Sequence, residues 1–126
     1  MANVCLFNIN IIVEEKSDVE EIKMYFTNRK DRTVKGIENY VITMEEDNQI
    51  NINGDCRWAV ATNMIHKEYI NEEKNITLQE ISEFHSCRME VESEEFGFNF
   101  KEAFIIENGS LIVEEVIDTD LFKNYN

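Results

Sequence analysis

The feature that most constrains the fold of this chain is the spacing of its apolar residues, which changes repeatedly between the two-residue period of a strand and the ~3.6-residue period of a helix. In "VCLFNINIIV" (4–13), β-branched and aromatic residues dominate and polar residues alternate with apolar ones, which is typical of a strand. The next segment has apolar residues at helical spacing, behind Ser17 and Glu20, which stand at the spacing of a capping box. A strand followed by a helix of about three turns is therefore predicted here.

The middle of the chain predicts a hairpin. In "IENYVITMEEDNQINING" (37–54), two short alternating runs flank a polar turn at 46–48. The segment 56–70 that follows carries apolar residues at both periods. It fits either a helix or an ordered connection.

The same switch returns in the second half. Thr77 and Glu80 form a second capping-box spacing, ahead of a helix that we expect to end near His85. Next, "CRMEVESEE" (87–95) alternates as a strand, and "FNFKEAFII" turns at "ENGS" into "LIVEEVI". The chain is thus predicted to close with a strand hairpin.

The predicted order is β, α, β, β, α, β, with one or two added terminal strands. This order matches the split βαβ pattern, so we expect an α+β fold: a ferredoxin-like split βαβ sandwich with an antiparallel sheet and an added C-terminal strand hairpin. The 126 residues, 43% of them hydrophobic, suffice for one core and are too few for two ordinary domains. No proline and only four glycines leave no linker composition, so residues 1–126 are interpreted as a single domain.

The net charge of the chain disfavours some classes of binding partner and favours others. Twenty-six acidic residues against twelve basic ones give a formal net charge of -14, which would repel nucleic acid and anionic membranes. Such a protein is attracted instead to a basic protein surface, where its carboxylates can stand in for phosphates. No segment approaches the ~20 apolar residues that span a bilayer, and three cysteines without CxxC spacing fit a reducing compartment. We therefore expect a cytoplasmic protein without direct membrane or nucleic acid contacts.

The stretch "VESEEFGFNFKE" (91–102) carries the first candidate site. Glu90, Glu92 and Glu94 stand at strand spacing and should project from one face. Gly97, between two phenylalanines, would allow a bulge or a close backbone approach. A carboxylate pair in a cleft could serve acid–base or metal chemistry, but no partner base or phosphate-binding loop accompanies it. A solvated strand face is the stronger interpretation, and the candidate binding residues here are Glu90, Glu92, Glu94, Glu95, Phe96 and Phe98.

Arg57 and Trp58 form the second candidate site. Both residue types are enriched among binding hot spots, and the pair could stack on a nucleotide base or anchor a partner. A single tryptophan after a strand is more often a core residue, so we expect Trp58 to be buried. The basic cluster "NRKDR" (28–32) is expected to cap the first helix, although it could hold one phosphate group.

Histidine and cysteine side chains raise the question of a metal. His66, His85, Cys56 and Cys87 are all potential zinc ligands, but their spacing matches no recognised zinc motif. Cys5 and Cys87 are better interpreted as small core residues. No metal or other cofactor is predicted.

Three stretches of the chain carry a family resemblance: "MANVCLFN" at the start, "GDCRW" at 54–58 and "VESEEFGFNFKEAFIIENG" at 91–109. Together they resemble the YubB-like, ferredoxin-like domain family of bacteria, plasmids and phages. The chain departs from the family where Val4 replaces a tryptophan and where Ala59, Val60 and Phe96 replace prolines. The positions that match the family are Met1, Ala2, Asn3, Cys5, Arg57, Trp58, Ser93, Glu94, Glu95, Gly97, Phe100 and Glu102. The resemblance implies the ferredoxin-like architecture and a mobile-element setting, without an established catalytic activity.

Two functions are consistent with these observations. The first is a non-enzymatic acidic interaction protein of a mobile element, which binds and blocks a basic host defence protein that acts on nucleic acid, as an anti-CRISPR or anti-restriction inhibitor would. The alternative is a protein that sequesters a small nucleotide-type ligand through Arg57, Trp58 and the basic cluster.

Overall fold

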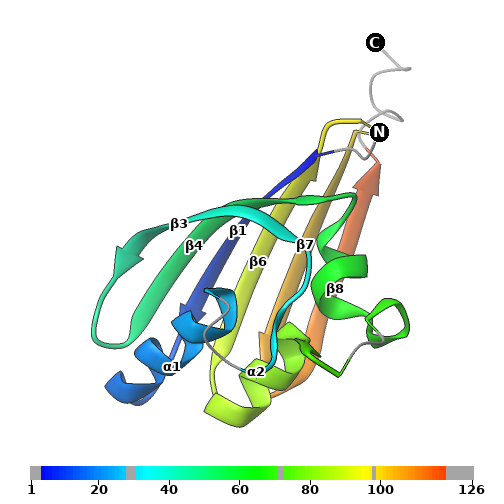
Figure 1. Cartoon of the computed structure of the whole chain (residues 1–126). Helices are drawn as coiled ribbons and strands as arrows, with labels where there is room; N and C mark the ends of the chain where they lie inside the picture. Colours follow the sequence, from blue (N-terminus) through cyan, green and yellow to red (C-terminus); the bar gives the residue numbers. More distant parts are fainter. Residues whose placement is uncertain (1–3, 28–30, 71–72, 98, 119–126) are drawn as a thin grey trace.

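A six-stranded antiparallel sheet forms the centre of the computed structural model, which describes residues 4–27, 31–70, 73–97 and 99–118. The strand order is β3-β4-β1-β6-β7-β8 (Figure 1). The six strands are β1 (Val4–Ile12), β3 (Ile37–Glu45), β4 (Gln49–Arg57), β6 (Arg88–Glu95), β7 (Phe100–Glu107) and β8 (Ser110–Asp118). Two short strands, β2 (Thr33–Val34) and β5 (Asn75–Ile76), pair with each other in parallel, a ladder that the hydrophobic pattern had not indicated.

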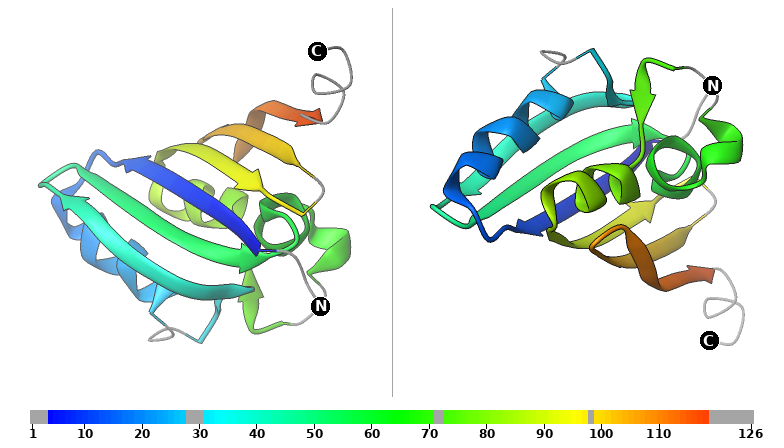
Figure 2. Two further views of the ribbon diagram at one scale, coloured as in Figure 1. Left: turned by 90° about the horizontal axis from the view of Figure 1, so that it is seen from above. Right: turned by 90° about the horizontal axis from the view of Figure 1, so that it is seen from below.

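The helices lie against one face of this sheet. They are α1 (Lys16–Phe26), α2 (Leu78–His85), the π-helical turn η1 (Ala61–Ile65) and the 3-10 turn η2 (Lys67–Tyr69). Figures 1 and 2 show α1 and α2 on the same side of the strands. Among the described residues, no element covers the other side, which we call the open face. The predicted α+β class with an antiparallel sheet is confirmed.

The core lies between the sheet and the helices because every second residue of the central strands points inward. In β1, Phe7, Ile9 and Ile11 are buried while their neighbours are partly or fully exposed, as a half-buried strand requires. Ile22 of α1 and Ile81 of α2 close the core from the helix side. This packing fixes which face of each strand remains open.

Of the two predicted capping boxes, the one at α2 is present and the one at α1 is not. Thr77 accepts a hydrogen bond from the Glu80 N–H, and the Glu80 carboxylate accepts one from the Thr77 N–H, so the predicted capping box of α2 is confirmed. The prediction for Ser17 was wrong, because α1 begins at Lys16 and Glu15 occupies the N-cap position without a side-chain hydrogen bond. Ser17 therefore lies inside the first turn, past the position that a capping hydroxyl must occupy.

The two predicted hairpins are also present. The Glu46 N–H donates to the Gln49 carbonyl across the β3–β4 turn, and β7 and β8 are joined at Asn108 and Gly109. The ambiguous segment 56–70 folds into the end of β4 and the short turns η1 and η2. Neither α1 nor α2 has the length and apolar character of a bilayer-spanning helix, and the same holds for every other helix in the described ranges.

Candidate functional site

The side chains on the open face of the sheet form three rows that run across the strands, as the strand register shows. On β6, Glu90, Glu92 and Glu94 point to this face. Each of these three lies between one residue of β1 and one of β7. Across β4, β1, β6, β7 and β8, the rows are Asn51–Asn10–Glu90–Ile105–Val113, Asn53–Asn8–Glu92–Ala103–Glu115 and Asp55–Leu6–Glu94–Lys101–Ile117.

The three glutamates form a column, as their spacing predicts. Glu92 and Glu94 are exposed, and Glu90 is partly exposed. The Asn10 amide donates to Glu90 at 3.2 Å, and the Arg88 guanidinium lies 3.6 Å from the same carboxylate. The carboxylates of Glu92 and Glu94 are therefore more exposed to solvent than that of Glu90.

Side-chain amides occupy the neighbouring half of the open face. Asn8 donates to Asn53 at 2.6 Å and to Asn51 at 3.0 Å, and Thr43 of β3 donates to Asn51 at 2.6 Å. The Asn53 amide in turn donates to the Thr43 hydroxyl. Because these groups hydrogen-bond one another, this half of the face is polar but largely satisfied.

Glu95 does not belong to the acidic column. It lies on the inward face of β6, fully buried at 0% exposure, and its carboxylate accepts a hydrogen bond from the Gly97 N–H at 2.6 Å. The prediction that Glu95 contacts a partner is therefore wrong. Of the two alternatives predicted for Gly97, the bulge is wrong, because Gly97 and the exposed Phe96 belong to the turn between β6 and β7. Phe98 lies outside the described residues.

Trp58 is on the surface, contrary to the expected core position. Its side chain is 48% exposed, and its backbone has φ 71°, the left-handed region that a bulky residue rarely adopts. This conformation lets the chain leave β4 and enter η1, and it turns the indole away from the core. Arg57, just before it, forms a 2.9 Å ion pair with Glu38 on β3.

A buried carboxylate, absent from the predicted sites, ties β7 to η1. Glu102 is 3% exposed, and its two oxygens accept hydrogen bonds from the backbone N–H groups of Val60 and Ala61 at 2.8 and 3.0 Å. The Ser93 hydroxyl donates to the same carboxylate at 2.7 Å, and the Cys5 thiol lies 3.9 Å from it. The alternation Glu102, Phe104, Ile106 on β7 was a signal that this side chain points inward.

Cys5 and Cys56 face each other beside Glu102. They are paired in the β1–β4 register and are both free and buried. Their mutual hydrogen bond lowers the pKa of the Cys5 thiol, although burial opposes this shift. The same hydrogen bond, together with burial, raises the pKa of Cys56. These two thiols fill the core, and neither is open to a substrate.

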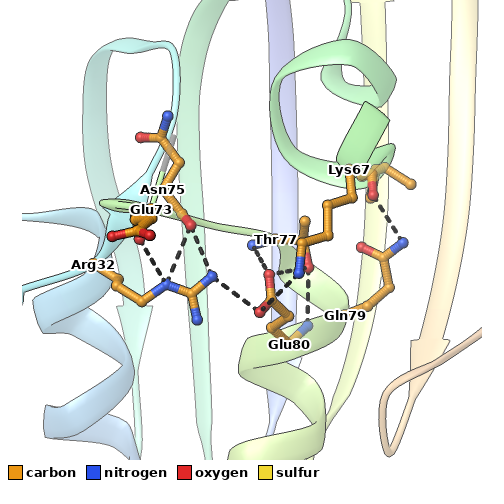
Figure 3. A network of polar contacts seen from close by, with 8 residues as sticks. Arg32, Lys67, Glu73, Asn75, Thr77, Gln79 and Glu80 are labelled. Carbon is orange, nitrogen blue, oxygen red and sulfur yellow. Dashed lines mark hydrogen bonds and ion pairs between the residues drawn. The ribbon is translucent and has the colours of Figure 1, made fainter. Parts of the chain in front are cut away.

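The basic cluster at 28–32 contributes one described cation, Arg32, which is used within the fold. Its guanidinium donates to the Asn75 and Glu73 carbonyls and, at 3.0 Å, to the Glu80 carboxylate (Figure 3). Arg32 therefore does not cap α1 as the cluster was predicted to do, and its guanidinium is bound within the fold. Residues 28–30 lie outside the described ranges.

The network in Figure 3 lowers the pKa of the Glu80 carboxyl. Burial alone would raise the pKa of this carboxyl, but the hydrogen bonds from Thr77 and Arg32 outweigh burial and hold the pKa below its ordinary value. Lys67 lies 3.8 Å from the same carboxylate, and Gln79 donates to the Ile65 carbonyl at the end of η1. The network therefore fixes α2 against β5 and η1.

The possible zinc ligands are not gathered in one place. His66 contacts Glu114 of β8 at 2.6 Å, whereas His85 lies between Asp18 at 2.7 Å and the Tyr25 hydroxyl at 3.2 Å. Within the described ranges, no three His, Cys, Asp or Glu side chains are grouped as metal ligands would be. The Asp18–His85–Tyr25 chain joins α1 to α2 and is largely buried, so we interpret it as a tie between helices.

Comparison of the chain with known families, curated proteins and solved structures gave no match. The resemblance to the YubB-like family stays a prediction, and its first three matching positions lie outside the described residues. The open face is therefore the feature of the molecule from which we infer a function.

Proposed function

We propose that this chain is a non-enzymatic interaction protein that binds the basic surface of another protein through its open sheet face. The observation that carries the proposal is the column of Glu90, Glu92 and Glu94 on that face. Alternate residues of a strand are about 6.6 to 7 Å apart, near the ~6 to 7 Å between phosphates along one nucleic acid strand. The partner is accordingly a protein that binds nucleic acid.

The overall charge supports the same class of partner. A net charge of -14 gives long-range attraction to a basic channel, and the column supplies a local row of carboxylates for contact. In its concrete form, the proposal is an inhibitor from a mobile element that blocks a host nuclease of the CRISPR or restriction type.

The proposed architecture is the ferredoxin-like one. The order β3-β4-β1-β6 places β4 between the two strands that α1 connects, and β1 between the two that α2 connects. This arrangement supports a split βαβ core, with β7 and β8 extending the sheet beside β6.

The small-ligand alternative has weaker support. A half-exposed Trp58 could stack on a base, but the two described cations proposed to bind a phosphate are engaged within the fold. Arg57 pairs with Glu38, and Arg32 pairs with Glu80. Binding of a basic protein is therefore the better-supported proposal.

The test replaces the three column glutamates with glutamine, which preserves side-chain shape. Association of the Glu90→Gln/Glu92→Gln/Glu94→Gln protein with a candidate nucleic-acid-binding nuclease is followed at low and high salt. The control carries Glu14→Gln, Glu46→Gln and Glu68→Gln, three exposed residues outside the face, so that both proteins lose the same charge.

The column variant should associate at least about tenfold more slowly at low salt and lose most of its salt dependence, whereas the control should stay close to the unmodified protein. Equal effects of the two triple variants would mean that net charge alone directs binding. That result would overturn the open face as the binding site.

A further inference from the structure

Two adjoining hollows form a groove along the open face. One has a volume of about 490 Å³ and the other about 430 Å³, and they share four lining residues, Asn8, Glu92, Ala103 and Glu115. Ala103 lies between Glu92 and Glu115 in the middle row, and its small side chain leaves the floor of the groove low. The groove therefore follows β6 and β7 across all three rows.

The two walls of the groove differ in chemistry. The β6 wall carries the carboxylates of Glu90, Glu92 and Glu94. The opposite side carries the apolar Ile105 of β7 with Val113 and Ile117 of β8, together with Glu115 and Lys101. Val113 and Ile117 remain more than a third exposed, so this side offers apolar surface to a ligand.

We propose that the occupant of this groove is a basic amphipathic α-helix of the partner protein, an inference that rests on the proposed function. The cations of the helix would face the β6 carboxylates, and its apolar side chains would lie over Ala103 against Ile105, Val113 and Ile117. Ion pairs would then hold one side of the helix, and burial of apolar surface would hold the adjacent side.

The dimensions of the sheet fit a helix. Two strand spacings separate β6 from β8, about 9.6 Å, close to the ~10 Å diameter of a helix with small side chains. Residues four apart on a helix are about 6 Å apart along its axis, close to the ~6.6 to 7 Å between alternate strand residues. Cations at positions i, i+4 and i+8 can therefore meet Glu90, Glu92 and Glu94 in turn.

An extended peptide fits this face less well. A strand gains its backbone hydrogen bonds from a sheet edge, and laid across a sheet face it would leave N–H and C=O groups unpaired. A helix satisfies its own backbone and presents only side chains to the face. The groove lies over the face of β6, β7 and β8, and its β8 residues are the ones whose side chains point to that face, which favours the helix.

The first experiment compares two peptides of about 16 residues with one composition. In one, arginines occupy i, i+4 and i+8 with leucines on the adjacent side. In the other, the same residues are shuffled and a central alanine is exchanged with a terminal proline, which breaks the helix. Fluorescence anisotropy with the full chain should give at least about tenfold tighter binding of the helical peptide, with increased helix content on binding by circular dichroism.

The second experiment fills the groove without changing its charge. Ala103→Phe and the milder Ala103→Leu should weaken binding of the helical peptide about tenfold or more. Val41→Phe enlarges an exposed side chain of β3 on the same face but outside the groove, and it should leave binding unchanged. Circular dichroism confirms that each variant is folded.

The outcomes separate this inference from the proposed function. Equal binding of the two peptides, or unchanged binding by both folded Ala103 variants, would overturn the helix while the acidic column could still bind basic proteins. If neither peptide bound even at low salt, the helix inference would again fail. The glutamine variants with a whole nuclease would then decide the proposed function separately.

Discussion

The carboxylate of Glu102 on β7 accepts a 2.8 Å hydrogen bond from the backbone N–H of Val60, which enters η1. A charge buried to this degree is tolerated because fixed donors surround it. This contact joins the added part of the sheet to the irregular segment after β4, so it should matter for stability rather than for binding.

Glu102→Gln should lower the free energy of unfolding by about 3 kcal/mol, because a neutral amide accepts poorly from two backbone donors and from Ser93. Glu102→Ala should cost about 3 to 5 kcal/mol, because a cavity is added. Urea denaturation followed by circular dichroism measures both. A cost below about 1 kcal/mol for Glu102→Ala would show that η1 does not depend on this carboxylate.

Trp58 offers a test that separates stability from binding. Trp58→Gly should change the free energy of unfolding by less than about 1 kcal/mol, because relief of the left-handed backbone offsets the loss of a half-buried side chain. Circular dichroism is the appropriate signal, since the chain has a single tryptophan. A loss of about 3 kcal/mol or more would restore the core position that the sequence had predicted.

The two capping-box spacings provide a matched pair of variants. Thr77→Ala should destabilise the protein by about 1 to 2 kcal/mol, because it removes the acceptor for the Glu80 N–H. Ser17→Ala should be nearly neutral, since Ser17 lies within the first turn of α1. Thermal or urea unfolding of the two variants decides the comparison. Equal costs would contradict the assignment of the caps.

Stability should depend on pH through Glu80. Because the pKa of Glu80 is lowered in the folded state, its charged form is stabilised by folding. That contribution is complete above the carboxyl's ordinary pKa and is lost as the pH falls through the lower folded-state pKa. Glu80→Gln should therefore reduce stability at pH 7, and the difference from the unmodified protein should shrink in acid.

The control for Glu80 is Glu83→Gln, which removes one exposed charge from the same helix without touching Arg32. Urea titrations at several pH values compare the two variants. A Glu80→Gln difference that stayed constant from pH 7 into acid would contradict a contribution from the ionised carboxylate.

The three thiols should resist modification in the native protein. Cys5, Cys56 and Cys87 are buried, and burial raises the pKa of Cys87 to about 11. Cys5 has a lowered pKa, yet its thiolate cannot meet a reagent while β1 stays paired. A chromogenic disulfide reagent should react with all three only in denaturant. Rapid labelling of Cys5 or Cys56 in the native protein would show that β1 or β4 opens locally.

Local periodicity predicted much of the candidate site. A strand alternates its side chains regardless of what surrounds it, so "MEVESEE" places Glu90, Glu92 and Glu94 on one face. The same rule places Glu95 and Glu102 on the inward face, where both are buried. The charge of Glu95 had suggested a surface position for that residue. Here the strand period was a better guide than the polarity of the residue.

The sequence by itself determined the order of the six long strands and the two α-helices, the acidic balance and the shared face of the three glutamates, because each depends on neighbouring residues or on composition. The tertiary structure decided that α1 begins ahead of Ser17, so that this residue does not cap the helix, and that Trp58 turns outward. It also brought Ala103 and Val113 beside the acidic column to make a groove. These results depend on contacts between segments far apart in the chain, which local periodicity does not encode.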